Sequence, residues 1–175
     1  VFWYIHPFVP LAREAYLHRM YFWALWKYQV RGPMLYSTCE WDFSGVDRCL
    51  DEFVINGNVD GQGTLLWPGE RGVLDSVRWE TLRDGIEDFD LHALLRERAE
   101  ARAKAHPGDP LAAEAQAALF DTDAVFRAVQ DEKDAAGYAL KMNSGGSPTW
   151  VSHNRPADLY GARARLAELL ERLSR

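Results

Sequence analysis

The decisive stretch of this sequence is Gly61-Gln-Gly-Thr-Leu-Leu-Trp-Pro-Gly69, followed closely by Ser76-Val-Arg-Trp-Glu-Thr-Leu-Arg-Asp-Gly-Ile-Glu-Asp-Phe89. The first block predicts a glycine turn, a buried strand over residues 64–67 and a turn at Pro68-Gly69. The second predicts a helix that begins at Asp75 or Ser76 and runs to about Ala105. A strand, a loop and a helix form one unit of a parallel α/β fold, in which ligands bind at the carboxyl ends of the strands.

The residues before this stretch continue the same alternation. Residues 1–5 are an apolar run without polar alternation, which is typical of a strand buried in a parallel sheet. Residues 12–30 have a helical pattern that Gly32 is expected to end, and residues 33–36 form a second strand. A long loop over residues 37–63 follows. Because three parallel strands alone leave open edges, we expect the last three β/α units of a TIM (β/α)8 barrel in residues 1–105.

The remainder of the chain reads as helical. His106-Pro-Gly-Asp-Pro110 ends the long helix, and further helices are expected over residues 111–120, 123–133 and 156–173. Residues 106–175 are therefore interpreted as a helical C-terminal extension that packs on the barrel.

Composition excludes several partners. The 175 residues carry a formal net charge of −6 and a pI of about 5.4, which argues against nucleic acid and anionic membranes. No apolar run is long enough to span a bilayer. Cys39 and Cys49 have no partner at zinc-ligand spacing, so neither a metal nor a cofactor is expected. They also leave open whether the compartment is oxidising.

The first residue is Val1, and residues 1–5 lack the features of a signal peptide. We therefore expect this chain to be the C-terminal part of a longer polypeptide and to require its N-terminal remainder. Any targeting signal would then lie upstream of residue 1, which leaves a periplasmic or secreted location open.

Side chains at the predicted strand ends are suited to a sugar. Aromatic rings stack on the C–H face of a sugar ring, while amides, carboxylates and guanidinium groups bind its hydroxyls. Ordinary core packing of the aromatics, and backbone hydrogen bonding by the histidine, are the alternatives. The candidate substrate-binding residues are His6, Tyr36, Glu40, Trp41, Trp67 and Arg78.

No catalytic residue is assigned within the chain. A Gly-x-Ser-x-Gly elbow is absent, and Gly61-Gln-Gly63 precedes a strand instead of following one as a dinucleotide fingerprint does. Glycoside cleavage usually needs two carboxyl groups across the bond, and neither Asp51-Glu52 nor the pairs on predicted helices offer a rigid one. The charged set from Arg78 to Asp88 has spacings of three and four. Such spacing predicts ion pairs that fasten its helix to the barrel.

Four blocks of sequence resemble the C-terminal part of the catalytic domain of glycoside hydrolase family 123, over about residues 1–100. They are Arg19-x-x-x-Trp23-x-x-Trp26-Lys27-Tyr28, Gly32-x-x-Leu35-Tyr36 with Trp41, Gly61-x-Gly63-x-Leu65-x-Trp67-Pro68-Gly69, and Ser76-x-Arg78-x-Glu80-x-Leu82-Arg83-Asp84-Gly85-Ile86-Glu87-Asp88. Tyr36 stands where the family more often has Trp, which is a departure that reduces the stacking surface.

This resemblance implies a barrel that acts on β-linked N-acetylgalactosamine by substrate-assisted, retaining hydrolysis. The acetamido oxygen of the substrate is the nucleophile in that family, and an Asp-Glu pair on an earlier strand orients it and donates the proton. That pair has no counterpart in this chain, which would supply the wall of the sugar pocket and be inactive alone. The alternative is a non-catalytic carbohydrate-binding barrel or a structural domain.

Overall fold

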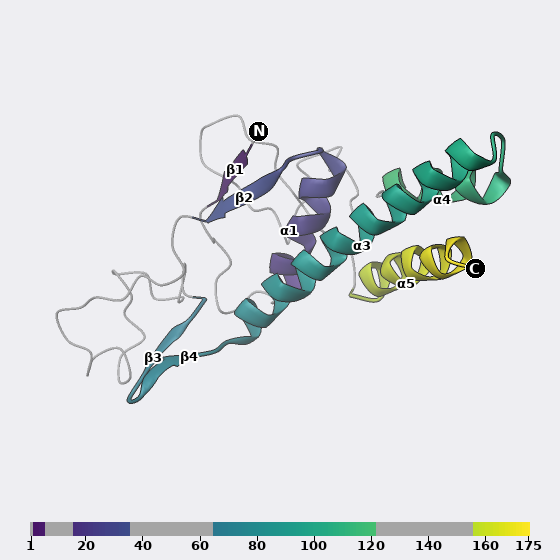
Figure 1. Ribbon diagram of the computed structural model, residues 1–175. Coiled ribbons are helices and arrows are strands. Elements are labelled where there is room, and N and C mark those ends of the chain that lie inside the picture. The colour runs from purple at the N-terminus through teal and green to yellow at the C-terminus, as the bar shows by residue number, and fades with distance from the viewer. Residues whose placement is uncertain (1, 6–15, 36–64, 122–155) are drawn as a thin grey trace, which may run out of the picture. The chain divides into compact units, whose positions relative to one another are not determined.

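The computed structural model describes residues 2–5, 16–35, 65–121 and 156–175, and helices predominate among them (Figure 1). Two compact units are present, Val1–Phe89 and Asp90–Arg175. Their boundary falls within one long helix, whereas the expected boundary at residue 105 lies at the end of that helix. The elements are β1 (Phe2–Ile5), α1 (Tyr16–Lys27), β2 (Gly32–Leu35), β3 (Trp67–Gly69), β4 (Gly72–Leu74), α3 (Val77–Ala105), α4 (Pro110–Phe120) and α5 (Pro156–Leu173).

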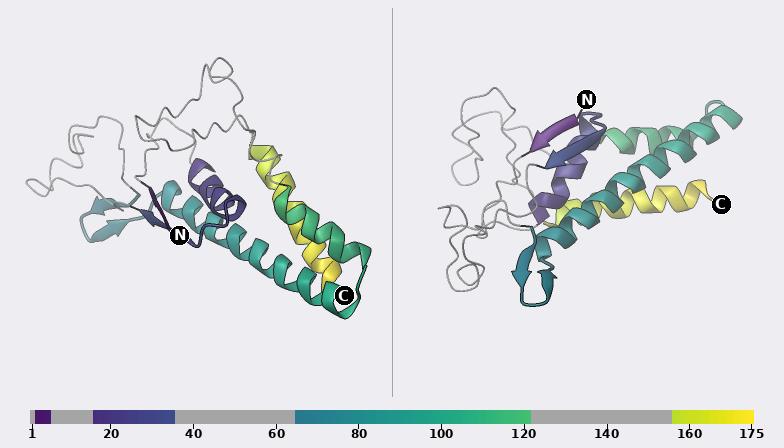
Figure 2. Two further views of the ribbon diagram at one scale, coloured as in Figure 1. Left: turned by 90° about the horizontal axis from the view of Figure 1, so that it is seen from above. Right: turned by 60° about the vertical axis from the view of Figure 1, so that its left-hand side comes forward.

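The first unit opens with a strand, a helix and a parallel strand. β1 pairs with β2 in a register that joins Phe2 to Gly32 and Ile5 to Leu35, and Figures 1 and 2 show the two strands side by side. Parallel pairing requires a crossover connection, and α1 lies within it. Within the described residues 2–5 and 16–35, the predicted order of strand, helix and parallel strand is confirmed.

The end of α1 differs from the prediction, because Gln29 and not Gly32 takes the left-handed backbone conformation, with φ of 52°. The N–H of Gln29 donates to Trp26 O at 3.0 Å, and the N–H of Val30 donates to Leu25 O at 2.8 Å. These bonds form a Schellman motif, whose usual apolar contact is supplied by Leu25 and Val30 in the core. Gly32 is thereby released to begin β2.

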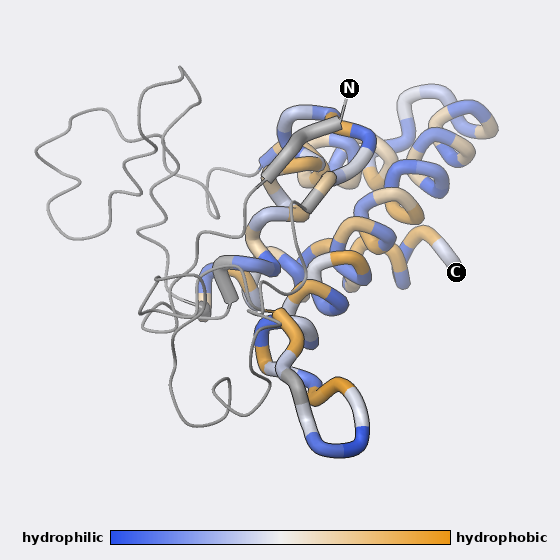
Figure 3. Tube along the Cα trace, turned by 90° about the vertical axis from the view of Figure 1, so that its left-hand side faces the viewer, coloured by the Kyte–Doolittle hydropathy of each residue, from blue (hydrophilic) through white to orange (hydrophobic). Residues whose placement is uncertain are grey.

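The prediction for the third strand is wrong in both its bounds and its pairing. Leu65 and Leu66 are not in a strand, and β3 begins at Trp67 and pairs antiparallel with β4, so that Trp67 lies opposite Leu74. Pro68 and Gly69 are inside the strand, and the hydrophilic residues Glu70 and Arg71 make the turn (Figure 3). Gly72 has a φ of 143°, which favours glycine and permits this tight reversal. Within the described residues, β3 has no parallel partner.

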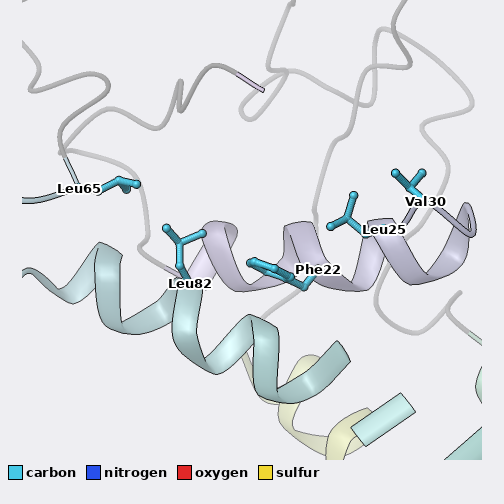
Figure 4. Packing of buried hydrophobic residues seen from close by; sticks show 5 residues of the cluster. All are labelled: Phe22, Leu25, Val30, Leu65 and Leu82. Atoms are coloured by element: carbon cyan, nitrogen blue, oxygen red, sulfur yellow. The ribbon is translucent and has the colours of Figure 1, made fainter. Parts of the chain in front are cut away.

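The hydrophobic core of the first unit joins α1, α3 and the residue at the base of the hairpin (Figure 4). Phe22, Leu25 and Val30 from the α1 region pack with Leu65 and with Leu82 of α3. Each such side chain contributes about 1.5–3 kcal/mol when fully buried. Trp23 and Trp26 of α1 are also buried.

The second unit consists of the C-terminal half of α3 with α4 and α5. Its predicted helices are confirmed where the structure describes them, while the helix expected over residues 123–133 lies outside the described residues. Asp109 caps α4 by accepting from the N–H groups of Leu111 at 2.9 Å and Ala112 at 3.0 Å. Arg172 of α5 donates to both carboxylate oxygens of Glu114 on α4, at 3.3 and 3.0 Å. Leu159, Leu166 and Leu169 form the buried face of α5.

The cap of α4 gives this unit a predicted pH dependence. Hydrogen bonds from the N–H of Ala112 and from the Arg102 guanidinium hold the pKa of Asp109 below its usual value. A lowered pKa in the folded state means that this stabilisation is present above about pH 4 and is lost as the pH falls through the folded-state pKa. Asp109→Asn keeps a capping oxygen but cannot titrate. We therefore expect the stability difference between the wild type and this variant, measured by urea titration of the helical circular dichroism, to shrink on acidification; a difference independent of pH would contradict it.

Candidate functional site

Only part of the predicted sugar site lies within the described residues. His6, Tyr36, Glu40 and Trp41 fall outside them, whereas Trp67 lies in β3 and Arg78 in the first turn of α3. Among the described residues, the candidate site consists of the β3–β4 hairpin and the beginning of α3.

The beginning of α3 is held at the base of the hairpin. The hydroxyl of Ser76 donates to the carbonyl oxygen of Leu65 and accepts from the N–H of Trp79 at 3.1 Å. Ser76 is thus the N-cap of α3, as one of the two predicted capping residues. Trp67 lies two residues after Leu65, and Arg78 lies two residues after Ser76. The bond between Ser76 and Leu65 therefore brings the segments of Trp67 and Arg78 to the same end of α3.

Arg78 is a buried cation, with 6% of its surface exposed. Burial lowers the pKa of its guanidinium from the usual value, although an arginine remains charged in proteins. Its position at the N-terminus of a helix is unfavourable for a cation, because the helix dipole is positive there. A buried guanidinium offers planar N–H donors that suit a carboxylate or adjacent sugar hydroxyls.

Trp67 is partly exposed on the hairpin and is paired across the strands with Leu74. Side chains of directly opposed residues share a face of a β-ribbon, so the indole and the Leu74 side chain form one apolar surface. Leu74 is 54% exposed, which means that the described residues leave this surface largely open. An indole of this kind can stack on the C–H face of a sugar ring.

Two of the charged residues of α3, Asp84 and Asp88, form ion pairs with Arg19 of α1. The Arg19 guanidinium binds both oxygens of Asp88, with Nε to Oδ2 at 2.6 Å and Nη2 to Oδ1 at 2.8 Å. Trp23 Nε1 donates to the same Oδ2 at 2.8 Å, and Arg19 Nη1 lies 3.4 Å from Asp84 Oδ2. Asp88 is completely buried and Arg19 is nearly so, and the Arg19–Asp88 pair is therefore a desolvated ion pair held by charge-assisted hydrogen bonds.

Sequence reasoning did not identify Arg19 as the partner in this network. A signal was present, because Arg19 and Trp23 are four residues apart on one helix and Asp84 and Asp88 are four apart on the other. Residues with that spacing lie on one helix face, so the two pairs can face each other. On the surface of α3, Arg83 Nη2 lies 2.6 Å from Glu80 Oε2, three residues before it, and Arg83 Nε lies 3.9 Å from Glu87 Oε1, four residues after it.

Near this end of α3, Glu80 is an exposed acid whose pKa is raised. A side-chain hydrogen bond with Asp75 is the main cause, and the neighbouring Arg83 acts in the opposite direction. Because the group is exposed and paired with a surface arginine, it has the character of a solvated acidic side chain and not of a buried catalytic acid.

No three His, Cys, Asp or Glu side chains within residues 2–5, 16–35, 65–121 and 156–175 are grouped so that they could hold a metal ion. Among the helices that the structure describes, none has the length and apolar character needed to cross a bilayer. No model of a known protein family matches the chain, and no curated protein matches it.

Proposed function

We propose that this chain is part of a glycoside hydrolase-like domain that acts on β-linked N-acetylhexosamine, of the N-acetylgalactosamine type, and that it supplies the wall of the sugar pocket. The observation that carries the proposal is the junction at the base of the hairpin. There the Ser76–Leu65 bond joins the segment of a partly exposed tryptophan to that of a buried arginine. Sugar sites commonly combine an aromatic platform with a few polar groups, and the two segments joined here supply one residue of each kind.

The network between α1 and α3 supports the family resemblance on which the substrate class rests. Arg19 and Trp23 belong to one of the resembling blocks, and Asp84 and Asp88 belong to another. These residues contact one another directly, so the two blocks form one physical interface. Such direct contacts are expected of residues that a family uses to hold two helices together.

In the proposed barrel, β1 and β2 are two of the last three strands. Ile5 and Leu35 form the final pair of their parallel register, and His6 and Tyr36 are the next residues along the chain. Since the carboxyl ends of parallel strands meet at one edge, His6, Tyr36, Glu40 and Trp41 are proposed to contribute to the same pocket. The proposed mechanism is substrate-assisted, retaining hydrolysis, with the catalytic acid pair on another part of the polypeptide.

Sugar binding is the direct test of the proposed pocket. We expect N-acetylgalactosamine to perturb the indole signals of the purified chain in a two-dimensional NMR titration, with affinity in the millimolar range, about −4 kcal/mol. Trp67→Ala should weaken binding about tenfold, because loss of one stacking platform costs about 1.4 kcal/mol in this range.

Trp79→Ala is the matched control. Trp79 is also a partly exposed tryptophan, at 39%, and lies one turn into α3, but it is not among the candidate residues. Its replacement should leave the affinity unchanged. Equal losses in both variants, or no binding by the wild type, would overturn the proposed site.

The chain by itself is expected to be inactive. Purified protein of these 175 residues should release no chromophore from a chromogenic N-acetyl-β-galactosaminide, because substrate-assisted cleavage needs a rigidly held acid pair and no acidic pair of this sequence is expected to be held on a strand. Hydrolysis of this substrate by the purified chain would contradict the prediction. The non-catalytic alternative is distinguished by adding the Asp-Glu-bearing part of the polypeptide: sugar binding that persists without turnover favours a carbohydrate-binding barrel.

A further inference from the structure

We draw no further inference here: the strongest candidate, the exposed apolar side chains of Val73 on the β3–β4 hairpin and of Val77 in the first turn of α3, carries nothing because the described part of the structure does not show what covers them.

Discussion

Asp88→Ala is expected to destabilise the first unit by about 3–5 kcal/mol, the usual cost of removing one partner from a buried ion pair. The carboxylate is 0% exposed and accepts hydrogen bonds from the Arg19 guanidinium and from the indole N–H of Trp23. Without it, the Arg19 guanidinium and the indole N–H of Trp23 lose these bonds in a site from which water is excluded. Desolvation that the ion pair had offset then becomes a net cost.

The measurement is urea-induced unfolding followed by tryptophan fluorescence. Six of the seven tryptophans lie in the first 89 residues, so this signal reports mainly on the unit that contains Asp88. Glu87→Ala is the control on the same helix. Its carboxylate is 59% exposed and 3.9 Å from Arg83, so its removal should change stability by less than about 0.5 kcal/mol.

A double variant separates the charge from the packing. Arg19→Met with Asp88→Leu removes both charges and keeps apolar volume, and it should recover much of the stability that Asp88→Ala loses. An Asp88→Ala variant that loses less than about 1 kcal/mol would show that the network does not hold α1 to α3.

Gly85→Ala is expected to destabilise the same unit by about 1–3 kcal/mol, although this substitution stabilises most exposed helix interiors by about 1 kcal/mol. A Cβ at this position would overlap Phe22 Cδ2 and lie 3.0 Å from Phe22 Cγ and 3.1 Å from Arg19 O. The Phe22 ring is packed in the core against its neighbours, and the Arg19 carbonyl is backbone, so neither yields easily.

Gly161→Ala in α5 is the matched control for Gly85. Gly161 is also inside a helix, but it is exposed and a Cβ built there meets no described atom within 4 Å. It should therefore stabilise its helix by about 1 kcal/mol, the ordinary propensity difference. Combining Gly85→Ala with Phe22→Ala should give a smaller loss than the sum of the two, because the clash is shared. Strict additivity, or a stabilising Gly85→Ala, would show that the helices do not approach closely at this point.

Helix ends were the most predictable features, because their chemistry is local. Ser76 was one of two predicted caps of α3, and His106-Pro-Gly-Asp-Pro110 ended that helix as expected. Gln29 is the exception. A glycine three residues later was the better candidate from residue type alone, but the contact of Val30 with Leu25 in the core determines where the chain turns.

The β3–β4 hairpin was missed for a different reason. Pro68-Gly69 has the composition of a turn, and the apolar residues before it have that of a strand. In the structure the turn is at Glu70 and Arg71, and Gly69 is in the strand, where a Cβ would come within 2.8 Å of Leu74 Cγ and 2.9 Å of Gly72 O. The pairing of Trp67 with Leu74 is a nonlocal choice that residue types around residue 68 do not specify.

The sequence by itself determined the described helices, the N-cap of α3, the parallel strand–helix–strand unit and the residue types suited to a sugar. These depend on periodicity and on short-range hydrogen bonding, which neighbouring residues specify. Only the tertiary structure decided that Arg19 binds Asp88, that the Phe22 ring packs against Gly85, and that the Ser76–Leu65 bond joins the segments of Trp67 and Arg78. The Arg19–Asp88 and Phe22–Gly85 contacts join residues far apart in the chain, and the Ser76–Leu65 bond closes the base of the hairpin. Each stabilises the protein only once folding has packed and desolvated its two sides.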